Sequence, residues 1–285
     1  MQLVEPRPAF AQIYSIDISN STNTTAVMKV IRDISREKEI EKMKSEFIFI
    51  AAHQLRTPLS AIKWVFSMIL DGDVGKITNE QKEILEKGKF STQRMIILVN
   101  DLLNISRIEE GKFNYNFENI NLEDIIKKVL AMEDNKIKEK EINLTFKKEP
   151  ATSTIVNGDS EKLYLALQNI IENAINYTFK KGSVEILIKE TDGNFKIEVK
   201  DTGAGIPKTD LNRLFNKFYR GSNVIRMQTE GTGLGLFITK NIIDRHNGKI
   251  EIDSKEGEGT KVSIFIPKPQ NKLDLMNKDS RGEIL

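Results

Sequence analysis

Apolar residues recur at every third or fourth position along two long segments in the first half of the chain. This spacing predicts two amphipathic helices, one over residues 36–71 and one from a Thr78 cap to near Gly111. The apolar stripe of the first helix comprises Ile48, Ala52, Leu55, Leu59, Ile62, Phe66 and Ile69. The matching positions of the second are Ile84, Ser91, Met95, Leu98, Leu102 and Ile105. One helical hairpin leaves much of such stripes exposed, so we expect two hairpins to pair as a four-helix bundle in a homodimer.

A different pattern, with short β-rich segments between helical ones, begins near residue 113. It predicts strands at residues 113–117, 142–147, 154–157, 183–190, 194–200, 249–254 and 261–266. It predicts helices at residues 121–138, 159–176 and 234–246. This order is typical of an α/β sandwich, in which helices cover one face of a mixed sheet. Residues 269–285 are polar and lack periodicity, which predicts a disordered tail.

Before the first helix, residues 13–18 alternate and residues 26–31 are rich in β-forming residues, which predicts two strands joined by the polar turn at residues 19–25. Two strands alone cannot bury a stable core. Residues 30–35, Val-Ile-Arg-Asp-Ile-Ser, resemble the last strand of a PAS sensory domain and its junction with a signalling helix. Two interpretations therefore stay open, the partial PAS-like tail and an arbitrary β-hairpin.

Composition narrows the class of protein. The chain has 285 residues, enough for about two domains, and its 43 basic and 41 acidic residues give a net charge of +2. Such a balance does not mark a nucleic-acid binder. The absence of cysteine excludes disulfides and thiolate metal sites and suits a reducing compartment. No apolar run approaches the roughly 18 residues of a membrane span. We expect a cytoplasmic location without membrane contact in this chain, although a longer parent protein could be anchored upstream.

His53 is the first candidate for chemistry. It lies on the polar face of the first predicted helix, which is shared with Arg56, Ser60 and Lys63. An imidazole in water is mostly an uncharged nucleophile near neutral pH. Pro58 has no N–H to bond the carbonyl of Gln54, so we expect a kink just below the histidine. Taken alone, this pattern also fits an ordinary surface histidine.

Three polar clusters in the second half of the chain suit a nucleotide. Asn169 and Asn173 share a helix face, and an amide oxygen is a hard ligand suited to Mg²⁺. Residues 201–205, Asp-Thr-Gly-Ala-Gly, follow a strand, and a fixed carboxylate there can accept a hydrogen bond from an amine such as that of adenine. Residues 231–235, Gly-Thr-Gly-Leu-Gly, open a helix whose N–H groups suit a phosphate chain. Each cluster alone is a weak signal.

Together and in this order, the motifs resemble those of two-component sensor histidine kinases. Residues 53–59, His-Gln-Leu-Arg-Thr-Pro-Leu, resemble the phosphoacceptor box. Residues 169–173, 201–205, 214–220 and 231–235 resemble the N, first glycine, F and second glycine boxes, and residues 257–260 resemble the final glycine turn. The resemblance covers residues from about 36 to 267.

This resemblance implies an α+β multidomain chain. A partial sensory tail at residues 1–35 would precede a dimerisation and phosphotransfer hairpin at 36–111. A Bergerat-type ATP-binding domain, an α/β sandwich, would cover 112–268, and a disordered tail 269–285. The resemblance implies ATP and Mg²⁺ as cofactors, a homodimer through the bundle and a response regulator receiver domain as partner. The implied activity is autophosphorylation of His53, followed by phosphotransfer to an aspartate of the regulator.

The resemblance also implies a role for each matching residue. Asn173 would ligate Mg²⁺ with support from Asn169, Asp201 would bind the adenine amine, Tyr177 would flank the nucleotide, and Arg220 would contact the γ-phosphate. The glycine boxes would contribute Gly203, Gly205, Gly231, Gly233, Gly235 and Leu236.

Three other positions receive an expectation from the same family. Thr57 matches the position that orients water for dephosphorylating the regulator, which implies phosphatase activity as well. Residues 208–230 would form a mobile ATP lid. His246 matches a family position distant from the chemistry, so we expect it to be structural.

Single residues and missing motifs separate the rival functions. Gyrase-type ATPases have a catalytic glutamate where Asn169 stands, and an asparagine cannot act as that base. The signatures of a serine/threonine kinase are absent. Gln54 stands where the family usually has an acidic residue, and Asn176 where it usually has a basic one. The alternative is therefore a Bergerat-fold ATP-binding dimeric scaffold with weak or no kinase activity.

Overall fold

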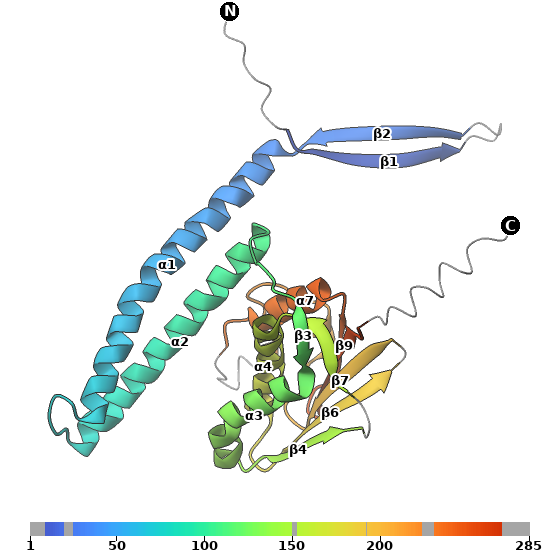
Figure 1. Cartoon of the computed structure of the whole chain (residues 1–285). Helices are drawn as coiled ribbons and strands as arrows, with labels where there is room; N and C mark the ends of the chain where they lie inside the picture. The colour runs from blue at the N-terminus through green and yellow to red at the C-terminus, as the bar shows by residue number, and fades with distance from the viewer. Residues whose placement is uncertain (1–8, 20–24, 150–152, 192, 224–230, 270–285) are drawn as a thin grey trace, which may run out of the picture. The chain divides into compact units, whose positions relative to one another are not determined.

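The computed structural model of the chain describes residues 9–19, 25–149, 153–191, 193–223 and 231–269. The chain divides into two compact units, Met1–Phe113 and Asn114–Leu285, and each is described by itself (Figure 1). Three regions with sequence-based expectations lie outside the described residues: most of the predicted turn, part of the predicted lid and nearly all of the predicted tail. They are residues 20–24, 224–230 and 270–285.

The first unit begins with a two-stranded antiparallel ribbon, β1 (Ala11–Ser19) and β2 (Thr25–Asp33), in which Ile13 lies opposite Ile31. The ribbon is hydrogen-bonded to the start of the next helix. The N–H of Ile34 donates to the carbonyl of Phe10 at 2.8 Å, and the N–H of Phe10 donates to the Ser35 hydroxyl at 2.8 Å. The two predicted strands are therefore present, and they continue directly into a helix.

Two long helices, α1 (Ser35–Asp71) and α2 (Asn79–Glu109), form the rest of this unit. The capping box predicted at Thr78 is present, because its hydroxyl accepts from the Gln81 N–H at 3.2 Å and its own N–H donates to the Gln81 side chain at 2.9 Å. Gly111, just after α2, has the positive φ of 67° typical of a helix end. The helix α1 continues through Pro58 as one element, so the proline does not divide it.

Packing between α1 and α2 covers only part of the predicted apolar stripe. Ala52, Leu59, Val99 and Leu103 form the buried cluster, with Phe49, Ile96 and Leu102 packed against it. Leu55 and Ile62 of the same stripe remain 52% and 44% exposed in the single chain. The first helix thus buries one side of its stripe within the hairpin and leaves the other side uncovered.

Polar contacts also join the two helices at fixed positions. The buried Ser106 hydroxyl donates to the carbonyl of Ser45 at 3.0 Å, and the Ser45 hydroxyl donates to the Glu109 carboxylate at 2.7 Å. The guanidinium of Arg56 donates to the side-chain oxygen of Asn100 through two nitrogens, at 3.0 and 2.5 Å. Directional bonds of this kind fix the register of α1 against α2.

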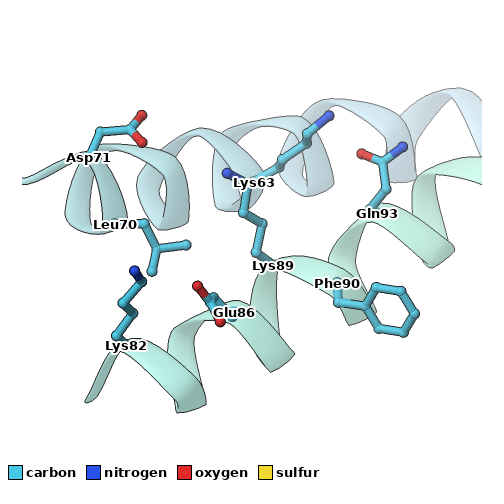
Figure 2. Close-up of a pocket in the computed structure, with 8 residues that line it drawn as sticks. All are labelled: Lys63, Leu70, Asp71, Lys82, Glu86, Lys89, Phe90 and Gln93. Carbon is cyan, nitrogen blue, oxygen red and sulfur yellow. The ribbon is translucent and has the colours of Figure 1, made fainter. Parts of the chain in front are cut away.

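Near the loop between α1 and α2, side chains of both helices line an open groove (Figure 2). Its lining residues are Lys63, Leu70, Asp71, Lys82, Glu86, Lys89, Phe90 and Gln93. Three of them are basic and two acidic, so the groove carries a slight positive excess. None of the described helices is long and apolar enough to cross a membrane.

The second unit is an α/β sandwich, as predicted. The helices given by the described residues are α3 (Leu122–Glu139), α4 (Ser160–Tyr177), the short α5 (Lys208–Leu211) and α7 (Gly235–Arg245). Its strands are β3 (Glu118–Asn121), β4 (Asn143–Lys148), β5 (Ile155–Gly158), β6 (Ser183–Thr191), β7 (Asn194–Asp201), β8 (Lys249–Lys255) and β9 (Gly259–Pro267). The main sheet has the order β4-β6-β7-β9-β8, in which only the β4–β6 pair is parallel, and β3 pairs separately with β5.

Helices α3, α4 and α7 pack beside one another against the main sheet (Figure 1). The core between these layers consists of branched aliphatic side chains, which fill a pleated surface well. Its fully buried members include Leu163, Leu167, Ile170 and Ile171 of α4 and Ile186, Ile188 and Ile197 of the sheet. Because α4 lies between α3 and α7, its ends and its polar face are fixed by both neighbours.

The strand predicted at residues 113–117 is wrong, since the strand in this region is β3, Glu118–Asn121. The alternating aromatic residues before it contact a histidine instead of a neighbouring strand. The rings of Tyr115 and Phe117 lie 5.7 and 4.9 Å from the ring of His246, and the N–H of Asn116 donates to the Asp159 carboxylate at 2.7 Å. An extended segment packed on one buried side chain produces the same alternation as a strand.

His246 is structural, as predicted. It is only 4% exposed, its Nδ1 lies 2.7 Å from the carbonyl of Ile242, and its Nε2 accepts from the N–H of Asp159 at 2.9 Å. These partners assign the proton to Nδ1 of a neutral ring. Burial lowers the pKa of His246 below its ordinary value of 6.5.

The lowered pKa of His246 gives a pH-dependent stability. The unfolded chain binds a proton at this residue more readily, so its contribution is complete above pH 6.5 and is lost as the pH falls below that value. We expect His246→Ala to lower the free energy of unfolding by about 2–4 kcal/mol and to remove this part of the pH dependence. Urea unfolding at several pH values measures both effects.

His53→Ala is the matched control, because the chain has only two histidines and His53 is exposed. It should retain the parent's dependence on pH. An unchanged pH dependence in His246→Ala would contradict the structural assignment.

Candidate functional site

His53 lies exposed on α1, one turn after Phe49, whose ring centroid is 6.3 Å from that of the imidazole. Gln54 and Thr57 are exposed on the same helix. The buried Ala52 directly before His53 belongs to the core between α1 and α2. The predicted orientation is therefore confirmed, with the imidazole open to solvent on a helix whose other side is packed.

In the second unit, α4 carries Asn169 and Asn173, and both are half-buried. The side-chain nitrogen of Asn169 lies 3.3 Å from the carbonyl of Gly235 and 3.4 Å from the hydroxyl of Thr239. These weak contacts bring the predicted N box against the start of α7, where the second glycine box lies. Asn173 is one turn further along α4.

Asp201 ends β7 and is buried, with 6% of its surface exposed. One of its carboxylate oxygens accepts from the N–H of Gly203 at 2.8 Å and from the N–H of Thr260 at 3.2 Å. Burial raises the pKa of Asp201, and the two N–H donors act in the opposite direction. The result is a carboxylate fixed in one orientation, which suits recognition of a single donor group.

Close approach of main chains explains the glycines that follow Asp201. A Cβ added at Gly203 would lie 2.2 Å from the carbonyl oxygen of Tyr177. Gly205 has a φ of 61°, and a Cβ there would lie 1.9 Å from the carbonyl oxygen of Lys255. No side chain fits at either place, so the first glycine box is required by the packing of the backbone.

Tyr177, the last residue of α4, contacts two of the predicted motifs. Its carbonyl accepts from the N–H of Ala204 at 3.1 Å. Its hydroxyl would lie 3.8 Å from a Cβ added at Gly231. The structure therefore brings the N box, both glycine boxes and Tyr177 together along the second half of α4, although the glycine boxes are far from it in the sequence.

Part of the predicted lid is attached to this region by side chains that the sequence did not single out. The buried Asp210 of α5 accepts from the N–H of Ser222 at 3.0 Å, and this bond lowers the pKa of Asp210. The side-chain nitrogen of Asn223 donates to the carbonyl of Gly205 at 2.8 Å. Arg220, also predicted as a site residue, lies half-buried in the same segment. No local pattern distinguishes Asp210 from other aspartates in a polar stretch.

Two family models match separate parts of the chain. Residues 43–111 match the His Kinase A (phospho-acceptor) domain, and residues 158–270 match the histidine kinase-, DNA gyrase B- and HSP90-like ATPase. The chain belongs to the sensor histidine kinases of two-component systems. In this histidine kinase, the first match contains His53 and the second contains Asn169, Asp201 and both glycine boxes.

Curated relatives agree with this family. The chain is 31% identical over 257 residues to the sensor protein kinase WalK of Staphylococcus haemolyticus. This alignment covers 89% of this chain and 41% of the relative. It is 31% identical over 255 residues to the sensor protein SrrB of Staphylococcus aureus, and this alignment covers 90% of this chain and 43% of the relative. The histidine kinase chain thus spans about two fifths of the length of these relatives.

A solved structure shares the fold of the histidine kinase. Full-length ShkA in complex with AMPPNP superposes with a TM-score of 0.64 at 24% identity, covering 79% of this chain and 46% of that one.

The close contact at Gly203 leads to a prediction about ligand binding. Gly203→Ala should weaken nucleotide binding by about tenfold or more, because the added Cβ displaces the turn that holds Asp201. Calorimetric titration with ATP measures the change. Gly231→Ala is the matched comparison, since within the described part of the chain a Cβ there meets only the Tyr177 hydroxyl, at 3.8 Å, and it should lose less affinity. Equal affinities for Gly203→Ala and the parent would contradict this account of the turn.

Proposed function

We propose that this chain catalyses ATP-dependent phosphorylation of His53 and transfers the phosphoryl group to an aspartate of a response regulator. In this proposal residues 36–111 form the dimerisation and phosphotransfer domain and residues 112–268 the ATP-binding domain. Residues 1–35 are the tail of a sensory domain, and residues 269–285 form a terminal tail. The observation that supports the proposal best is the meeting of three nucleotide motifs along α4, in one chain with an exposed histidine on α1.

The site residues receive the following roles. Asp201 accepts a hydrogen bond from the adenine amine, and Tyr177 flanks the base. Asn169 supports the site through its contacts with Gly235 and Thr239. Arg220 neutralises charge on the γ-phosphate. Backbone groups at the phosphate chain come from Gly203, Gly205, Gly231, Gly233, Gly235 and Leu236.

The amide oxygen proposed as protein ligand suits Mg²⁺. Among the described residues, no group of three or more histidine or carboxylate side chains is placed to hold a metal ion. Mg²⁺ bound with a nucleotide needs few protein ligands, because phosphate oxygens and water complete its octahedron. The half-buried amide of Asn173, one turn from Asn169 on α4, would supply the protein oxygen. The ion would neutralise charge that develops on the phosphates.

Phosphoryl transfer to His53 then requires positioning more than acid–base chemistry. The lone pair of Nε2 attacks the γ-phosphorus, the bond from that phosphorus to the bridging oxygen breaks, and ADP leaves. Nδ1 carries the ring proton, which the amide oxygen of Gln54 can orient but cannot remove. Asn169 cannot act as a base for water, so bound ATP is protected until the histidine arrives.

The surface of the hairpin supports a homodimer. Phe47, Ile50 and Leu55 are 72%, 54% and 52% exposed on α1, and Ile84 is 68% exposed on α2. Large apolar side chains in such number on two helices are covered when two hairpins pair as a four-helix bundle. The receiver domain of the regulator would dock on this bundle beside His53, where Thr57 would orient water for dephosphorylation. We place the chain in the cytoplasm and assign it no nucleic-acid partner.

One observation favours the alternative, an ATP-binding dimeric scaffold with weak or no kinase activity. Asn176 lacks the cation usual in the family, and the two neighbouring lysines that could replace it lie beside a surface carboxylate. Lys180 and Lys181 lie 2.8 and 3.8 Å from the carboxylate of Glu141. The following experiments separate a kinase from a scaffold.

Incubation with γ-labelled ATP should label the chain on His53. Phosphohistidine is labile in acid and stable in base, so the label should disappear in acid and be absent from His53→Ala. Ser60→Ala, a change on the same exposed face of α1, should still be labelled. A label that survives acid, or that persists in His53→Ala, would contradict the kinase assignment, and no label on any variant would favour the scaffold.

Restoring the usual acidic residue after the histidine should accelerate the reaction. A carboxylate at position 54 can accept the Nδ1 proton, and such assistance is typically worth about 10²–10⁴-fold. We expect Gln54→Glu to raise the single-turnover labelling rate at saturating ATP by about tenfold or more. Asn176→Lys should raise it as well, by adding a cation near the phosphates.

Gln54→Met, similar in size and neutral, is the control and should label no faster than the parent. If Gln54→Glu and Asn176→Lys also match the parent, these departures from the family are neutral.

A further inference from the structure

The end of α4 has an unusual set of hydrogen-bond partners. The last four carbonyls of an α-helix have no partner within the helix and need one elsewhere. The carbonyl of Ala174 accepts from the N–H of Thr178 at 3.1 Å and from its hydroxyl at 2.6 Å. The carbonyl of Tyr177 accepts from the N–H of Ala204, in the first glycine box. Two carbonyls of the last turn, at residues 175 and 176, remain to be satisfied.

Lys140 satisfies both of them and one more. Its ammonium lies 3.0 Å from the carbonyl of Ile175, 2.6 Å from that of Asn176 and 3.2 Å from that of Thr178. An ammonium has three N–H donors and no acceptor, so these carbonyls use its full capacity. A cation is also favoured there by the negative end of the helix dipole.

The backbone of Lys140 is fixed by its neighbours. Lys140 is the C-cap residue directly after α3, and α3 packs beside α4 (Figure 1). Its N–H donates to the carbonyl of Lys136 at 3.0 Å, and its carbonyl accepts from the N–H of Lys181 at 2.9 Å. The ammonium is thus held between the end of α3 and the segment that follows α4.

Placing an ammonium at this helix end costs desolvation free energy. A glycine or solvent water usually satisfies the end of a helix, without desolvating a charge. Here the half-buried Lys140 is partly desolvated, and this burial lowers its pKa. The other lysines near the end of α3 behave differently, because Lys136 and Lys138 are exposed and pair with Glu133 and Asp134.

The contacts of Lys140 reach the nucleotide site through one carbonyl. Lys140 holds the carbonyls at residues 175, 176 and 178 on one side, which leaves the carbonyl of Tyr177 to the Gly203–Ala204 turn. Within that turn, the N–H of Gly203 donates to the carboxylate of Asp201. A small rotation of the last turn of α4 would therefore move the acceptor proposed for the adenine amine.

We infer that Lys140 is a positioning residue for the adenine end of the nucleotide site, acting through the carbonyl of Tyr177. This inference rests on the proposed function, since it assumes that Asp201 recognises adenine. It does not give Lys140 a contact with the nucleotide. Lys140 determines where the first glycine box lies, and through it how well the site selects adenine.

The test uses Lys140→Met in the full chain, a change that keeps the length of the side chain and removes the ammonium. We expect the affinities for ATP and ADP to fall equally, by about tenfold, and the preference for ATP over GTP to shrink. In autophosphorylation the KM for ATP should rise while the rate at saturating ATP stays near that of the parent. Circular dichroism and thermal unfolding establish that the variant is folded.

Lys138→Met is the matched control, because it removes an exposed lysine two residues away whose partner is Asp134. It should bind ATP as the parent does and keep the preference for ATP over GTP. If Lys140→Met does not fold, Lys140→Gln, which keeps two N–H donors on a shorter side chain, is tested for the same loss of selectivity.

The outcomes separate this inference from the function on which it rests. A parent chain that binds no adenine nucleotide would overturn both. A parent that binds ATP, with Lys140→Met or the folded Lys140→Gln equal to it in affinity and selectivity, would overturn the role of Lys140 alone. An equal loss of ATP and GTP affinity would likewise overturn it, since a general loosening of the domain does not discriminate between bases.

Discussion

The contact between the end of α4 and the first glycine box constrains the whole nucleotide region. The carbonyl of Tyr177 lies so close to Gly203 that no Cβ fits between them, and it accepts the N–H of the next residue, Ala204. With the turn fixed in this way, the N–H of Gly203 reaches Asp201 and holds its carboxylate at the end of β7. Main-chain hydrogen bonds therefore connect the end of α4, the turn after β7 and the Asp201 carboxylate, beside the aliphatic core that joins the helices to the sheet.

The helical hairpin follows a different principle. Its core within one chain is small, centred on Ala52, Leu59, Val99 and Leu103, and polar contacts such as that of Ser106 with the carbonyl of Ser45 fix the register of the helices. Much apolar surface remains on the same two helices. Exposed apolar surface of this extent marks the two helices as an interaction surface. His53 is exposed because it lies outside the buried stripe of α1 that contains Ala52 and Leu59.

Amides occupy several places in this chain where ATP-hydrolysing relatives or other kinases have charged groups. Asn169 uses its side-chain nitrogen to contact the start of α7 and has no basicity with which to activate water. Gln54 and Asn176 are neutral as well. Two lysines after α3 and α4 contact the protein itself, Lys140 through carbonyls of α4 and Lys180 through the carboxylate of Glu141.

The sequence by itself determined the features that follow from local periodicity and local chemistry. The spacing of apolar residues predicted both helices of the hairpin and the exposed face of His53, and Thr78 with Gln81 predicted the start of α2. The order of the asparagine and glycine motifs predicted which segments would meet. The same reasoning failed at residues 113–117, because alternation in a sequence does not distinguish a strand from an extended segment that packs on His246.

Only the tertiary structure decided the contacts that join distant residues. Asp210 and Lys140 look like ordinary surface residues in the sequence, yet Asp210 holds Ser222 and Lys140 holds the end of a helix that begins 20 residues later. Which lysine reaches which carbonyl depends on how α3 packs beside α4. A charged side chain carries no local signal of its partner, because the partner is set by the packing of the buried faces and not by neighbours in the chain.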